Sequence, residues 1–121
     1  MKTITLQQEI KADSLGWLVS ERINKTITIK EIRLPSETNA HEGWTEVRIK
    51  LLRGPDISPD ALLRAQDITQ EVFGTNKIYL DRERVILETD FRIDGIGYCL
   101  VFQIKNGTKD GRIYTAQVFY D

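Results

Sequence analysis

His41 and Glu42 are neighbouring side chains that could exchange a proton near neutral pH, and they stand in a polar segment at residues 35–43. Together they would form the acid–base pair of an enzyme. His41 is, however, the only histidine of the chain, and no serine lies in a nucleophile-elbow pattern. We therefore interpret His41 as a solvent-exposed loop residue and treat catalysis as the least favoured function.

Cofactor and metal chemistry are not indicated by the other reactive residues. Cys99, the single cysteine, falls in the most apolar stretch of the chain, so we interpret it as a small buried hydrophobic side chain. One histidine and one cysteine, without clustered aspartates, leave too few ligands for zinc or calcium. Gly95-Ile96-Gly97 lacks the third glycine of a dinucleotide-binding loop and leads into a predicted strand. We predict no cofactor and no bound metal.

Residues 44–53 alternate in a way that indicates a strand with one apolar face and one charged face. Val47, Ile49 and Leu51 share the apolar face. An exposed tryptophan among charges of both signs is typical of the hot spots of protein-binding surfaces. We therefore predict a partner-binding patch on the other face and in the loop before it: Trp44, Glu46, Arg48 and Lys50, with His41 and Glu42 beside them.

Two alternative binding functions stay open. A tryptophan flanked by cations, here Arg48 and Lys50, also suits single-stranded nucleic acid, although Glu46 interrupts that set. The other alternative is a small ligand held inside a barrel. Its cavity would be lined by Tyr98, Leu100, Phe102, Tyr114, Ala116 and Tyr120.

The composition of the 121 residues limits the class of protein. Basic and acidic residues nearly balance, 17 against 18, so no net field draws the chain to nucleic acid or to an anionic membrane. No stretch reaches the roughly 18 apolar residues of a membrane span, and the first residues lack the apolar core of a signal peptide. The lone cysteine fits a reducing compartment. We expect one domain, residues 1–121, of a cytoplasmic protein without membrane contact.

The segment from Ile96 to Tyr120 organises the predicted fold. Residues 96–104 and 113–120 read as the two arms of a β-hairpin joined by a polar loop. The first arm is apolar at nearly every position, which predicts a central strand covered on both faces. Three apolar residues, 118–120, follow one another in the second arm, so at least one ring should face outward and invite a partner or a second copy.

The other segments supply neighbours and cover for that hairpin. A single helix is predicted at residues 59–73, with Ser58 as N-cap, Pro59 at the first helical position and Gly74 as a left-handed stop. Strands are indicated at residues 3–10, 17–34, 44–53, 76–80 and 85–93. Apolar positions change parity near Lys30, which indicates a bulge or a break, and a turn near residue 24 is an alternative.

Short turns between successive strands favour antiparallel neighbours. We therefore predict an α+β fold: a mainly antiparallel, bent sheet of about six or seven strands, or a partly open barrel, with one covering helix. This plan is common among immunity proteins, inhibitors and assembly subunits, an analogy of size and plan without a family motif. We predict a non-enzymatic protein-binding module whose partner is another protein or a second copy of the chain.

Overall fold

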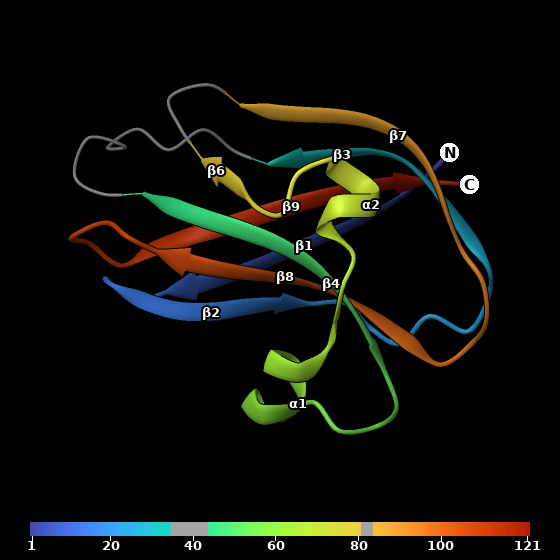
Figure 1. Cartoon of the computed structure of the whole chain (residues 1–121), viewed down its shortest axis with the longest axis horizontal. Coiled ribbons are helices and arrows are strands. Elements are labelled where there is room, and N and C mark those ends of the chain that lie inside the picture. The colour runs from blue at the N-terminus through green and yellow to red at the C-terminus, as the bar shows by residue number, and fades with distance from the viewer. Residues whose placement is uncertain (35–43, 81–83) are drawn as a thin grey trace.

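The computed structural model describes residues 1–34, 44–80 and 84–121, which form two antiparallel β-sheets facing each other (Figure 1). The first sheet has the strand order β1 (Lys2–Ile10), β9 (Arg112–Tyr120), β3 (Ile27–Leu34) and β7 (Val85–Ile93). The second sheet has the order β2 (Ser14–Val19), β8 (Tyr98–Asn106) and β4 (Thr45–Arg53). The short strands β5 (Gln66–Asp67) and β6 (Ile78–Leu80) both pair with β4.

The pairing of the strands is nested along the chain. β1 pairs with β9, β2 with β8, β3 with β7, and β4 with β6. A long hairpin folded over on itself produces this order, which is that of a jelly roll. The prediction of a mainly antiparallel fold is confirmed, but a single bent sheet is wrong, and the described strands do not close into a barrel.

The predicted hairpin between residues 96 and 120 is also wrong. β8 pairs with β2 and β4 in the second sheet, whereas β9 pairs with β1 and β3 in the first. The chain changes sheet between them, as it does between β2 and β3 and between β7 and β8. Facing sheets lie about 10 Å apart and neighbouring strands about 4.8 Å apart, so a loop of a few residues spans either gap. The pattern of residues therefore identified most of the strands but not their neighbours. The predicted strand at residues 17–34 is wrong, because this segment contains the end of β2 and all of β3, which lie in different sheets.

The strand β8 is covered on both faces, as predicted. Tyr98, Leu100 and Phe102 are at most 1% exposed and pack in the core between the two sheets. Cys99 and Val101 point to the outer face of the second sheet, where a smaller cluster includes Leu62 of the helix α1 (Pro59–Arg64). Burial of the lone cysteine is thereby confirmed.

The predicted helix at 59–73 is interrupted. It consists of α1 and of α2 (Thr69–Phe73), and the intervening Gln66–Asp67 pairs with β4. The predicted ends are confirmed: the Ser58 hydroxyl accepts a hydrogen bond from Ala61 N at 3.3 Å, and Gly74 has the left-handed conformation at φ 77°. The break lets the two helices cover different surfaces. The helix α1 lies on the outer face of the second sheet, whereas α2 packs against β4 and β7.

Two further details match the sequence pattern. The register of β3 against β7 and β9 shifts between Ile29 and Glu31, which is the predicted change of parity. Burial along β7 alternates from residue to residue, as expected for a strand with one face on the core. None of the helices in the described part of the chain is long and apolar enough to cross a membrane.

Candidate recognition surface

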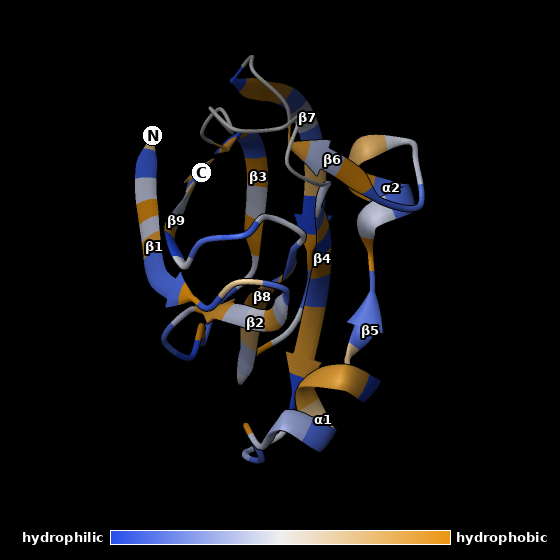
Figure 2. Cartoon of the chain, turned by 90° about the vertical axis from the view of Figure 1, so that its left-hand side faces the viewer, coloured by the Kyte–Doolittle hydropathy of each residue, from blue (hydrophilic) through white to orange (hydrophobic). Residues whose placement is uncertain are grey.

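The outer face of the second sheet is covered by α1 at one end only. Figure 2 shows the hydrophobic residues of β4 concentrated toward the end that α1 covers. Cross-strand register places the outward-facing residues that α1 does not bury in two rows, because residues directly opposite share a face. We call these rows and the adjoining Trp44 the open face: Leu15, Lys105, Glu46 and Tyr79 in one row; Trp17, Gln103 and Arg48 in the other.

An exposed aromatic pair stands at the edge of the open face. Trp44 and Tyr79 are 61% and 43% exposed, and their rings meet edge to face with centroids 5.5 Å apart. Edge-to-face contact of this kind holds both rings in place and leaves their other surfaces free. The Lys77 ammonium lies 5.4 Å from the centroid of the Tyr79 ring and 3.4 Å from a carboxylate oxygen of Glu46. Interaction with the Tyr79 side chain, followed by that with Glu46, raises the pKa of Lys77.

Carboxylates neutralise the cations of this surface. The guanidinium of Arg48 lies 3.1 Å from an Asp67 oxygen, and the ammonium of Lys105 lies 3.0 Å from an Asp13 oxygen. Lys77 is paired with Glu46 as described above. Within the described residues, the open face therefore presents aromatic surface among paired charges of both signs.

Lys50 does not belong to the open face, although its position on the strand predicted that it would. It is 6% exposed, and its ammonium donates hydrogen bonds to the carbonyl oxygens of Leu63 at 2.9 Å and Leu62 at 3.4 Å. Burial lowers the pKa of Lys50. The helix α1 folds back over this end of β4, so the side chain caps a helix instead of facing solvent.

Of the other predicted site residues, the structure brings Trp44, Glu46 and Arg48 together and adds Tyr79. His41 and Glu42 lie outside the described residues. Tyr79 was missed because its place beside Trp44 depends on the register of β6 against β4, which the sequence pattern does not contain.

A partly buried loop at residues 107–111 supports the backbone beneath Trp44. A Cβ on Gly107 would lie 1.9 Å from the Trp44 carbonyl oxygen, so only glycine permits this close approach. The adjacent Asn106 is fully buried, and its amide nitrogen donates to the carbonyls of Ile10 and Asp110 at 3.1 and 2.9 Å. Its amide oxygen accepts from Thr108 N at 2.9 Å. This network fixes the loop that carries Gly107.

The described residues form no candidate metal site. No three side chains of His, Cys, Asp or Glu among them gather where they could hold a metal ion.

Comparison with known proteins identifies no relative by sequence: no family model matches the chain, and no curated protein matches it. Among solved structures, the chain is similar to the crystal structure of a Yersinia pseudotuberculosis-derived mitogen. The match has 12% sequence identity and a TM-score of 0.45, and it covers 97% of this chain and 84% of the mitogen chain. A likeness this weak supports no conclusion about the fold or function of this chain.

Proposed function

We propose that the chain is a non-enzymatic protein-binding module of the immunity, inhibitor or assembly-subunit type, and that it binds its partner through the open face. The exposed pair of Trp44 and Tyr79 carries this proposal. Two large rings on a rigid sheet lose little conformational entropy on binding and offer the aromatic surface that dominates protein interfaces. The mixed charges of Glu46, Arg48 and Lys77 around them would orient the partner.

The same charges favour a protein over a nucleic acid. A phosphate backbone binds cations that are free to replace its counterions. On the open face and at its edge, Arg48, Lys105 and Lys77 each have a carboxylate within 3.4 Å, so a polyanion would have to displace an existing partner at each of these cations. A protein surface with charges of both signs can instead join such pairs.

The alternative of a ligand inside a barrel loses its support. The residues expected to line that cavity belong to the core between the sheets, and five of them are at most 2% exposed: Tyr98, Leu100, Phe102, Tyr114 and Ala116. Side chains of the two facing sheets fill this space, as in a packed sandwich.

Partner capture with a paired control tests the proposal. Immobilised wild-type chain is exposed to a lysate of the source organism, and the captured protein is identified and purified for affinity measurement. The double variant Trp44→Ala, Tyr79→Ala should bind that protein at least about tenfold more weakly, because hot-spot aromatics dominate such interfaces. A photo-crosslinking residue at position 48 should attach to the same protein.

The control variant is Ile86→Ala with Ile113→Ala. These side chains are similarly exposed, at 52% and 62%, but lie on the outer face of the first sheet. Binding should survive this change. Equal binding by the aromatic double variant, at wild-type thermal stability, would contradict the proposed surface.

We also propose that the partner is either another protein or a second copy of the chain, acting in the cytoplasm. The single thiol, Cys99, is 4% exposed and needs no oxidising compartment, which supports the cellular location. Sedimentation equilibrium of the wild type and of Trp44→Ala distinguishes self-association through the open face from binding to another protein. Cell fractionation tests the location.

A further inference from the structure

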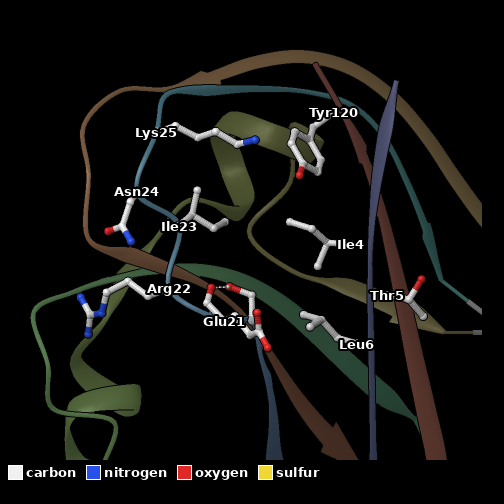
Figure 3. Close-up of a pocket in the computed structure, with 10 residues that line it drawn as sticks. Ile4, Thr5, Leu6, Glu21, Arg22, Ile23, Asn24, Lys25 and Tyr120 are labelled. Atoms are coloured by element: carbon white, nitrogen blue, oxygen red, sulfur yellow. Dashed lines mark hydrogen bonds between the residues drawn. The ribbon is translucent and has the colours of Figure 1, made fainter.

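A groove lies beside the free edge of β1, away from the open face. Its volume is about 490 Å³, and it is bordered by β1 on one side and by residues 20–25 on the other. Figure 3 shows Ile4 and Leu6 of β1 pointing into the groove, Ile4 toward Ile23 and Leu6 toward Glu21, with Tyr120 at one end. The floor is therefore apolar and continuous with the core, to which Ile4, Leu6 and Tyr120 belong as partly buried members.

The edge of β1 is unprotected. β1 pairs only with β9 among the described strands, so alternate residues direct their N–H and C=O groups away from the sheet. Residues 3–8 carry no charge and no proline, and the register with β9 runs without a bulge from Lys2 to Ile10. Proteins normally protect an edge strand with a charge, a proline or a bulge, because an unprotected edge pairs with other chains.

The opposite edge of the same sheet shows the usual protection. β7 carries Glu88, Asp90 and Arg92 at exposed alternate positions. Charges in this arrangement discourage the addition of another strand. The contrast between the two edges indicates that the bare edge of β1 is a docking position.

Charges at the ends of the groove define the occupant further. The Lys25 ammonium lies 5.6 Å from the centroid of the Tyr120 ring, and Lys25 is close enough to Lys2 that hydrogen bonding and repulsion between them lower the pKa of Lys25. No ion pair joins either lysine to a carboxylate within the described residues. At the other end, Glu21 lies near Leu6 (Figure 3). One end of the groove thus favours an anion and the other a cation.

We propose that the free edge of β1 binds an extended peptide segment of a partner protein as an added strand, with alternate apolar side chains in the groove and an acidic residue beside Lys2 and Lys25. Main-chain hydrogen bonds to β1 supply affinity, and the groove selects the side chains, as in other cases of strand addition. The segment spans about five residues, the usual length of a strand. This surface shares no residue with the open face, so a result that contradicts one proposal leaves the other unaffected.

Synthetic peptides and NMR of the full chain test this inference. The probe is a capped peptide in which valine and threonine alternate, with glutamate at one end and lysine at the other, and a second probe has the reverse sequence. Titration should shift the amide signals of residues 3–8 and 20–25, and the β1 amides that face away from β9 should exchange more slowly. The same peptide with N-methyl groups on alternate residues cannot complete the ladder and should bind at least about tenfold more weakly.

A charge reversal identifies the acidic subsite. Lys25→Glu should weaken the tighter of the two probes about two- to fivefold, the size of one exposed ion pair, and a probe with lysine in place of the glutamate should recover the loss. Lys109→Glu reverses an exposed lysine of a distant loop and should change nothing. Each of three results would overturn the inference: no shifts at millimolar peptide, equal binding of the N-methylated peptide, or a wild-type dimer in which β1 is already protected.

Discussion

The carboxylate of Asp67 accepts hydrogen bonds from both the hydroxyl and the backbone N–H of Thr69, at 2.6 and 2.9 Å. The Thr69 hydroxyl oxygen also accepts from Ile49 N in β4 at 2.8 Å, in a fully buried position. These bonds start α2, end the preceding extended segment and join both to the second sheet. They give a physical reason why one predicted helix became two.

Replacing Thr69 with valine should therefore destabilise the fold. Valine has nearly the same shape but leaves the Ile49 N–H buried without an acceptor, at a cost of about 1–3 kcal/mol in the free energy of unfolding. Thr69→Ser keeps the hydroxyl and should lose less. Urea denaturation of the three proteins measures the difference, and equal midpoints for valine and wild type would show that the hydroxyl is dispensable.

The stability of the chain should fall in acid partly through Asp67. Burial opposes ionisation and is the largest single influence on this carboxyl, but hydrogen bonds from Thr69 and Arg48 together outweigh it and lower the pKa. The folded state then binds fewer protons than the unfolded state. The contribution is present above the ordinary aspartate pKa of about 3.9 and is lost as pH falls through the lower folded value.

Asp67→Asn removes this contribution. Its free energy of unfolding should be lower than that of wild type at neutral pH and should decline less steeply below about pH 4. Hydrogen bonds from Ser58 also lower the pKa of Asp56, so some acid dependence should remain in the variant. Parallel acid-dependence curves for variant and wild type, measured by urea denaturation at a series of pH values, would contradict the role given to Asp67.

Most of the strands could be predicted from the sequence, and their partners could not. The apolar run around Leu100 predicted a strand covered on both sides, and the parity change near Lys30 predicted a bulge or a break, which the structure shows as a register shift of β3. The loop at residues 107–111 permits either a hairpin or a change of sheet, because a few residues can span both distances. The choice depends on how all the strands pack together.

The candidate surface could be predicted only in part, because its exposure also depends on how the elements pack together. Alternation along residues 44–53 identified Trp44, Glu46 and Arg48 from local sequence. Lys50 obeys the same alternation, but its burial follows from the position of α1, which only the tertiary fold provides. Tyr79 joins the surface through strand pairing across a segment that contains both helices. Local patterns therefore describe a strand's faces but not what covers them.

Gly107→Ala should disturb the support of the open face. The new Cβ would overlap the Trp44 carbonyl oxygen, and the backbone must move, so we expect a loss of about 1–3 kcal/mol or more. Gly111→Ala is the matched control in the same loop, because its Cβ would meet no atom closer than 3.6 Å. Thermal unfolding compares the two, and near-ultraviolet circular dichroism reports on the tryptophan environment. Similar losses in both variants would mean that the close approach is not the cause.

Lys50→Met should separate helix capping from recognition. Burial lowers the pKa of Lys50, so between the folded value and the ordinary lysine value of about 10.4 the unfolded state binds more protons. The free energy of unfolding of the wild type should therefore rise with pH across that interval relative to the methionine variant, which lacks the ammonium. Capture of a partner through the open face should be unchanged, because the side chain is 6% exposed. Arg48→Met removes the exposed neighbouring cation on the same strand face and should weaken capture; a loss confined to Lys50→Met would place the contact at α1 instead.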